Sequence, residues 1–154
     1  MATEIEHKYL VKNKSYRKLA IRSHNITQGY LSKQSGQTVR IRIRDEEAFI
    51  TIKGPSKKDV RPEFEYPIPL NDAQQILTLC LDEPIVKTRF IVIDNGNTWE
   101  IDEFHGALEG LVIAEIELPS ADYNYPLPDF IGKNVTDDKR YYNSNLSTLE
   151  ALKH

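Results

Sequence analysis

Cysteine, methionine and tryptophan each occur only once in this chain of 154 residues. The single Cys80 excludes an internal disulfide, and its place in the apolar run Ile76–Leu81 indicates a buried helical residue. No stretch is apolar for long enough to span a bilayer, and the N-terminus lacks the apolar core of a signal peptide. We therefore expect a cytoplasmic protein with no membrane association, and a single domain over residues 1–154.

A strong excess of charge of one sign is also missing, because the net charge is only −3. No polybasic surface indicates nucleic acid or an anionic membrane as a partner. The histidines His7, His24, His105 and His154 lack the spacing of metal ligands, so we assign them no role. No Walker-type glycine loop is present either.

What the chain does have is a charged residue at alternate positions, repeated in many short segments. Glu4, Glu6 and Lys8 are two apart, so in a β-strand they project from one face and Ile5 projects from the other. The pattern returns at Arg40-Ile41-Arg42, Glu63-Phe64-Glu65, Lys87-Thr88-Arg89, Glu100-Ile101-Asp102 and Glu115-Ile116-Glu117, and more weakly at Thr51-Ile52-Lys53. Antiparallel sheets often have a polar face in water, but this face is ionisable almost throughout. We interpret it as the lining of a site.

Periodicity and turn residues predict about eight strands and a few helices, joined mostly by hairpins. Strands are expected at residues 3–11, 26–32, 38–44, 48–53, 61–67, 85–93, 98–104 and 111–118, with hairpin turns at 45–47 and 94–97. Helices are expected at 14–23 and at 71–81, the second capped by Asn71, and a final helix near Thr136. The segment after Pro119 is predicted to be irregular.

Two architectures would bury the apolar faces of these strands. An open sheet would leave its charges in water, whereas a curled sheet would enclose them and carry the helices outside. Eight strands suffice to close a barrel, and closure removes unpaired edges. Five of the charged pairs carry a single sign, acidic at 63/65, 100/102 and 115/117 and basic at 40/42 and 87/89, and clustered like charges repel unless a ligand of opposite sign is present. We therefore expect an α+β fold: an eight-stranded antiparallel β-barrel, or tunnel, with a charged interior, helices packed outside and Trp99 in the core.

The basic residues of such a lining suit a polyanion. Arginine binds phosphate oxygens through a bidentate fork, and lysine adds compact positive charge. The residues of this kind are Arg40, Arg42, Lys53, Lys87 and Arg89.

The acidic residues suit a hard divalent cation, which prefers oxygen ligands. Mg²⁺ or Mn²⁺ between Glu4 or Glu6 and Glu115 or Glu117 would neutralise these carboxylates, polarise a phosphoryl group and acidify a water. Phosphoryl transfer needs little beyond positioning and charge, so no serine, cysteine or histidine nucleophile is required.

The N-terminal Glu4-x-Glu6-x-Lys8, followed in order by the later charged pairs and by Asp137-Asp138-Lys139-Arg140-Tyr141, resembles the CYTH superfamily of triphosphate tunnel metalloenzymes, which includes bacterial inorganic triphosphatases. The resemblance covers nearly the whole chain. It implies an eight-stranded antiparallel tunnel that binds a triphosphate end-on and requires a divalent metal.

The resemblance also implies a role for each charged residue. Metal ligands would be Glu4, Glu6 and Glu117, with Glu115 and Asp102 nearby to hold a second metal or orient water. A phosphate cradle would be formed by Lys8, Arg40, Arg42, Lys53, Lys87 and Arg89, with Lys139 and Arg140 of the closing helix at one tunnel mouth. Glu63, Glu65 and Glu100 would support these groups. Tyr30 faces inward by alternation and resembles a tyrosine that narrows the tunnel, with simple packing as the alternative. Arg44, Lys57 and Lys58 are expected to be surface charges.

Within the family, the resemblance leaves inorganic, thiamine and nucleoside triphosphatase and class IV adenylyl cyclase as possible activities. Trp99 points away from the lining and cannot easily stack on a base or a thiazolium, and a tyrosine at the mouth favours a small ligand. We therefore predict metal-dependent hydrolysis of inorganic tripolyphosphate, a small-molecule partner, to pyrophosphate and phosphate. An adenylyl cyclase and a non-catalytic polyphosphate-binding module are the alternatives.

Overall fold

The computed structural model describes residues 2–55, 57, 60–142 and 145–146. Its strands are β1 (Ala2–Val11), β2 (Arg22–Ser32), β3 (Thr38–Arg44), β4 (Glu47–Lys53), β5 (Val60–Ile68), β6 (Ile85–Asp94), β7 (Asn97–Phe104), β8 (Val112–Glu117) and β9 (Ile131–Asn134). The helices are α1 (Tyr16–Leu19) and α2 (Leu70–Leu77), with 3₁₀ turns η1 (Gln34–Gly36), η2 (Gly106–Leu108) and η3 (Lys139–Tyr141). Lys58 and His154 lie outside the described residues. Among the described helices, none combines the length and the apolar character needed to cross a membrane.

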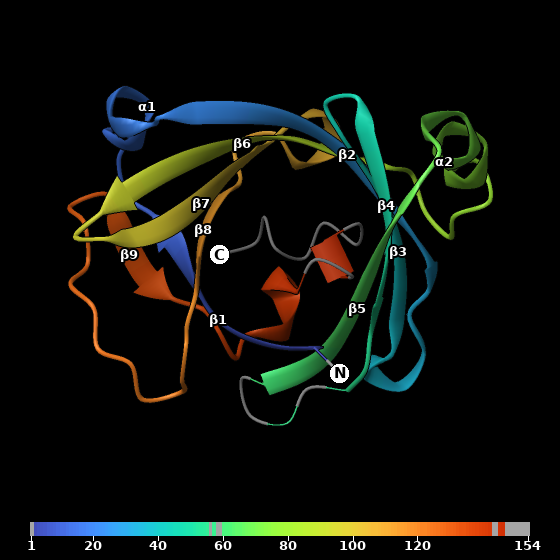
Figure 1. The fold of residues 1–154 in the computed structure, drawn as a ribbon. Coiled ribbons are helices and arrows are strands. Elements are labelled where there is room, and N and C mark those ends of the chain that lie inside the picture. The colour runs from blue at the N-terminus through green and yellow to red at the C-terminus, as the bar shows by residue number, and fades with distance from the viewer. Residues whose placement is uncertain (1, 56, 58–59, 143–144, 147–154) are drawn as a thin grey trace.

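The strands form one antiparallel sheet that closes on itself. Their order is β5-β4-β3-β2-β6-β7-β8-β1, and a further pairing of β5 with β1 joins the two ends. Figure 1 looks into the resulting ring of strands, with α1 and α2 outside it. The predicted closed eight-stranded barrel is therefore confirmed, and the open sheet is excluded.

The outer face of the barrel carries most of the hydrophobic core. One cluster joins Trp99, Ile101 and Ile116 of the sheet to Tyr16 of α1 and to Phe130. A second cluster packs sheet residues around Ile41 against Ala73 of α2. Trp99 is completely buried, as expected from its alternation with Glu100.

The cover over the outer face is incomplete, although we expected the helices to cover it. Ile52, Phe64 and Tyr66 on β4 and β5 are 41%, 36% and 55% exposed. Helix α2 packs beside Ile50 and Ile68 of the same two strands and leaves these three side chains only partly covered.

A third cluster fills one end of the barrel interior. Ile85, Phe104 and Ile113 share the inner face with the charged residues of their strands, and they pack against Val135, Tyr141 and Leu146. Nζ of Lys8 donates to the carbonyl oxygen of Tyr141 at 3.0 Å. In Figure 1 the turn η3, which follows β9, accordingly lies within the ring. One end of the interior is therefore apolar and occupied by Val135, Tyr141 and Leu146.

The first two predicted helices are shorter than expected, because sheet hydrogen bonds compete for their ends. The segment that follows Leu19 joins β2, whose Arg22 and Ser23 pair with Ile91 and Phe90 of β6. Helix α2 begins at Leu70, one residue before the predicted cap Asn71, and ends at Leu77. Beyond it, Leu81 N donates to Tyr30 O of the sheet at 2.9 Å.

The C-terminal part of the prediction was wrong in two respects. The segment expected to be irregular contains β9, which pairs with Tyr9 and Val11 of β1. Residues 136–138 are not helical, and the side chain of Asp138 instead caps the short turn η3. β9 lacks alternation, and it contains Gly132, where an added Cβ would lie 3.1 Å from Leu10 O. Its strand conformation therefore depends on tertiary pairing.

A cluster on α1 and β7 leads to a prediction about stability. The hydroxyl of buried Tyr16 donates to Glu103, and Arg17 donates to the same carboxylate through Nε at 2.7 Å and Nη2 at 2.8 Å. The Arg17 hydrogen bonds, assisted by that of Tyr16, hold the pKa of Glu103 below its ordinary value. A carboxylate with a depressed folded-state pKa stabilises the fold above its unfolded pKa, and this contribution is lost as the pH falls through the folded pKa.

We expect Glu103→Gln to lower the free energy of unfolding by about 1–2 kcal/mol at pH 7, because it replaces hydrogen bonds to a charged acceptor with neutral ones. Urea unfolding at pH 7 and in acid measures the effect, which should shrink as the wild-type carboxylate is protonated. Glu109→Gln, at an exposed position, is the control. An equal loss at both pH values would contradict this explanation.

Candidate active site

The alternating charges converge inside the barrel. Lys53 of β4 reaches across the intervening β5 to Glu4 of β1, with Nζ 2.8 Å from Oε1. The described lining residues that are buried despite their polarity are Glu4, Lys8, Gln28, Thr38, Arg40, Thr51, Lys87, Arg89, Asp102 and Glu115. Ion pairs between strands that are not neighbours require a shared interior, so the predicted lining is real.

The strand order sorts this lining into two walls, which were not evident from the sequence. The basic predicted residues lie on β4, β3 and β6, which are consecutive except for β2, and the acidic ones lie on β7, β8, β1 and β5. We call these the cationic wall and the acidic wall. Lys8 on β1 is the exception, and it faces Glu115 in the register of β1 with β8.

The cationic wall is crowded with guanidinium groups. Burial, together with the charges of Arg40 and Arg89, lowers the pKa of Arg42 to about 9. Arg42 Nε donates to Gln28 Oε1 at 2.8 Å. Arg40 Nη2 donates to Thr51 Oγ1 at 3.1 Å, while its Nε is buried without a hydrogen-bond partner. Positive charges that repel one another and a buried donor without an acceptor favour an anion at this wall.

Asp102 joins the two walls along one seam. It accepts two hydrogen bonds from Arg89, at 2.7 and 2.9 Å, and lies 2.7 Å from Lys87 Nζ. Although burial opposes ionisation, Arg89 and Lys87 hold the pKa of Asp102 well below its usual range. Burial lowers the pKa of Lys87 to about 7, against the attraction of Asp102. Both oxygens of Asp102 are thus engaged by cations, and in this structure it positions those cations.

Lys53 joins the walls along the other seam. It contacts Glu4 at 2.8 Å and Glu63 at 3.6 Å, and across the wall Arg40 lies 3.6 Å from Glu65. Burial opposes the charge on Lys53, yet Glu4 and Glu6 raise its pKa. The supporting role predicted for Glu63 and Glu65 stays a prediction, and these contacts place both carboxylates beside the cations concerned. Glu100 makes a similar contact with Arg89, at 3.5 Å.

Carboxylates on the acidic wall lie close together, so their negative charges repel one another. Glu6 pairs with Glu117 in the register of β1 and β8, and Glu115 is opposite Glu100 in that of β8 and β7. Burial and the charge of Glu115 raise the pKa of Glu6 well above its ordinary value. Burial also raises the pKa of Glu117, with Glu4, Glu63 and Glu100 adding to it. Burial opposes ionisation of Glu115 as well, but Lys8 and Glu6 bring its pKa to about 2.

The donor set of this wall fits a divalent cation. Glu115 Oε1 is buried without a hydrogen-bond partner, which is an acceptor that a cation would complete. Carboxylate oxygens are the ligands that hard divalent ions prefer. In the part of the chain that the structure describes, no group of three or more His, Cys, Asp or Glu side chains already stands in metal-binding geometry. Binding of an ion by Glu4, Glu6, Glu115 and Glu117 would require these side chains to move.

Not every predicted site residue reaches the charged lining. Lys139 is exposed on η3, and Arg140 pairs with Asp138 at 2.6 Å and stacks on the ring of Tyr141. Tyr30 is buried on the inner face of β2, opposite Arg40. Arg44 stacks on the ring of Phe49 at 5.1 Å and is partly exposed, in keeping with the expected surface charge.

The sequence analysis assigned no role to several uncharged lining residues. Gln28 contacts Arg42, and Thr51 links Arg40 to Glu65 by donating to Oε2 at 2.8 Å. Phe49 lies in phase with Thr51 on the inner face, opposite Arg42 in the register. The available signal was alternation itself: Gln28 is two residues from Tyr30, and Phe49 is two from Thr51. The prediction of the lining used charged residues, and Gln28, Thr51 and Phe49 are uncharged.

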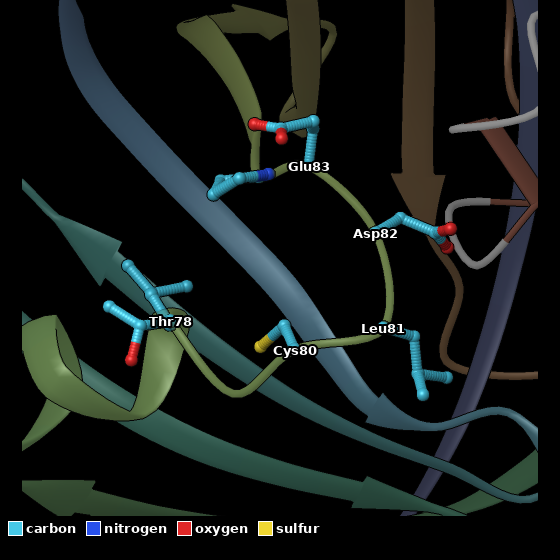
Figure 2. A pocket seen from close by; sticks show the side chains of 7 residues that line it. Thr78, Cys80, Leu81, Asp82 and Glu83 are labelled. Atoms are coloured by element: carbon cyan, nitrogen blue, oxygen red, sulfur yellow. The ribbon is translucent and has the colours of Figure 1, made fainter.

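A cavity of about 420 Å³ lies outside the barrel, along the connection from α2 to β6 (Figure 2). It is lined by Leu77, Thr78, Cys80, Leu81, Asp82, Glu83 and Pro84. Cys80 lies beyond the last residue of α2 and is only partly buried, so the expected buried helical cysteine was wrong. Its lining carries the carboxylates of Asp82 and Glu83, and Lys33 pairs with Asp82 at 2.6 Å, so the cavity has no excess of positive charge to attract a polyphosphate.

Comparison with known proteins identifies the family. The sequence profile of the CYTH domain matches residues 2–150. The chain belongs to the CYTH family. The family inferred from the charged pairs is confirmed.

Characterised relatives match this CYTH protein along nearly its whole length. An inorganic triphosphatase of Acetivibrio thermocellus is 43% identical over 147 residues, which cover 95% of this chain and 94% of the relative. An inorganic triphosphatase of Nitrosomonas europaea is 30% identical over 150 residues, covering 94% of this chain and 97% of the relative. A crystal structure of an inorganic triphosphatase matches with a TM-score of 0.69 and 30% identity, over 96% of this chain and 95% of that one. The CYTH barrel thus has the fold of a solved triphosphatase.

Proposed function

We propose that this CYTH protein hydrolyses inorganic tripolyphosphate to pyrophosphate and phosphate inside its barrel. The observation that carries the proposal is the pair of opposed walls, with cations on β3, β4 and β6 and carboxylates on β1, β5, β7 and β8. The names of the relatives at 43% and 30% identity support the same activity. The cytoplasmic location expected from the sequence stays a prediction.

The cationic wall binds and orients the phosphate chain. Arg42, Arg40 and Arg89 face the same space, and their mutual repulsion is relieved when an anion lies between them. Because one end of the interior is filled by the cluster around Tyr141, the chain enters from the other end. This end-on binding places a terminal phosphoryl group against both walls at once.

The acidic wall would hold the catalytic ion. Mg²⁺ or Mn²⁺ bound by Glu4, Glu6, Glu115 and Glu117 would supply charge neutralisation of phosphoryl oxygens and a water of lowered pKa. Asp102 keeps Lys87 and Arg89 oriented toward the substrate, and Lys8 offsets the charge of Glu115. In the reaction, the oxygen of a water attacks the terminal phosphorus while the bond to the bridging oxygen breaks. Pyrophosphate leaves with the electron pair of that bond, and a proton of the attacking water passes to the released pyrophosphate or to solvent.

The lining favours a ligand without a nucleobase or a thiazolium ring. Phe49 is an inner-face aromatic ring that could stack on a nucleobase, but Arg44 occupies a face of that ring at 5.1 Å. Phe104 is buried beneath Lys87 in the cluster that fills one end of the interior. A nucleotide or thiamine triphosphate would have to displace these contacts, whereas tripolyphosphate would not.

A comparison of substrates tests the proposal. Phosphate release from tripolyphosphate, ATP and thiamine triphosphate should be measured side by side with Mg²⁺ and with Mn²⁺, and chromatography should identify the products of ATP. We expect the highest kcat/KM for tripolyphosphate and no cyclic AMP. A preference for either organic substrate would overturn the choice, and tight binding without metal-dependent turnover would indicate a binding module.

A further inference from the structure

Gln28 is completely buried on the inner face of β2, and half of its side-chain amide has no partner. Oε1 accepts from Arg42 Nε at 2.8 Å, while Nε2 is buried without a hydrogen bond. The orientation of the amide is determined chemically, because a guanidinium group has only donors and must face the oxygen. The unused half of Gln28 is therefore a donor.

The surroundings of this donor indicate what is missing. A buried donor without an acceptor costs free energy, so native proteins rarely keep one unless a ligand or water completes it. The residues opposite Gln28 on the neighbouring strands are Arg42 on β3 and Ile85 on β6, and neither side chain offers an acceptor. Arg40 Nε on the same wall also lacks an acceptor. The absent group is thus an acceptor that tolerates several positive neighbours, which describes an anionic oxygen.

We propose that Gln28 is a substrate-binding residue, whose Nε2 donates to a non-bridging phosphate oxygen while its Oε1 holds Arg42 in position. This inference rests on the proposed function and adds a ligand to the same site. A neutral donor has an advantage at this position, because another cation would add to the repulsion among Arg40, Arg42 and Arg89. The amide supplies a directional hydrogen bond without that repulsion.

A double-mutant cycle separates the two halves of the amide. Gln28→Met keeps the approximate shape and removes both polar atoms, and Arg42→Met removes the guanidinium group. The dissociation constant of tripolyphosphate is measured by titration calorimetry without metal for wild type, both single variants and the double variant, together with KM in the presence of metal. In the Arg42→Met background, we expect Gln28→Met to raise the dissociation constant about fivefold or more, the worth of a hydrogen bond to a charged acceptor. No effect in that background would overturn the proposal, because Gln28 would then act only through Arg42.

Gln28→Glu provides a second comparison with nearly the same shape. It keeps an acceptor for Arg42 but removes the donor, so we expect weaker tripolyphosphate binding than in Gln28→Met. Affinity equal to or above that of wild type would overturn the proposal, since it would show that only the contact with Arg42 matters. Thermal melting confirms that each variant is folded, and Gln28→Glu in the Arg42→Met background replaces Gln28→Met if the latter does not fold. A wild type that binds tripolyphosphate but does not turn it over contradicts the proposed function alone, because the binding cycle can still be completed.

Discussion

Glu6→Gln is expected to lower kcat for tripolyphosphate about 1000-fold, because a charged metal ligand contributes several kcal/mol of transition-state stabilisation. Burial and the neighbouring Glu115 and Glu4 already raise the pKa of Glu6, so the fold tolerates this carboxylate without deriving stability from its charge. Glutamine has the same shape but cannot neutralise a divalent ion. We therefore expect Glu6→Gln to lose turnover and to keep its folding stability.

Binding of tripolyphosphate without metal should respond in the opposite direction. Removing a negative charge from the acidic wall lessens repulsion of the phosphate chain, so Glu6→Gln should bind tripolyphosphate in EDTA as tightly as wild type, or more tightly. Steady-state kinetics over a range of Mg²⁺ and Mn²⁺ concentrations, with calorimetry in EDTA, measure the two effects. Glu109→Gln is the matched control, being the same change on the exposed surface. If turnover and metal-free affinity fell together, Glu6 would belong to phosphate binding instead.

Alternation of charge was sufficient to predict which face lies inside, because a strand places residues two apart on one side. Glu4, Arg40 and Lys87 are all buried in the interior as this rule requires. The rule gives no order of strands. That Lys53 meets Glu4 follows from the closure of β5 on β1, whereas Asp102 meets Lys87 within the hairpin of β6 and β7.

The errors of the sequence analysis share a physical origin in tertiary contacts that override local preference. Residues 22–25 have no strong strand signal, but they become β2 because β6 offers a free edge to pair with. Gln28 carries no charge, so a role for it is indicated only by the structure, in which Arg42 donates to its side chain. Residues 136–138 carry good helix-start residues, but Val135 and Tyr141 on either side are buried in the end of the barrel. The segment between them forms a turn, in which Asp138 N donates to Val135 O at 3.0 Å.

Arg42→Met is expected to raise KM for tripolyphosphate about 100-fold and to weaken metal-free binding to a similar extent, because charge-assisted bonds to phosphate are among the strongest in proteins. Arg42 is central to the cationic wall, between Arg40 and Arg89, and Gln28 fixes its guanidinium group. Arg42→Lys keeps the charge but loses the bidentate fork, so we expect an intermediate loss of about tenfold. In contrast to Glu6→Gln, the effect should be present with and without metal.

The melting temperature of Arg42→Met distinguishes a loss of phosphate binding from misfolding. Burial and the repulsion of Arg40 and Arg89 lower the pKa of Arg42, so in the ligand-free protein its charge opposes folding. Arg42→Met should therefore melt at the same temperature as wild type or higher, while losing the stabilisation that tripolyphosphate gives to wild type. Arg44→Met is the matched control on the same strand, because Arg44 stacks on Phe49 and is partly exposed. A large rise in KM for Arg44→Met, or a destabilised Arg42→Met, would contradict the assignment of phosphate binding to Arg42, because the loss of affinity would then no longer be specific to the centre of the cationic wall.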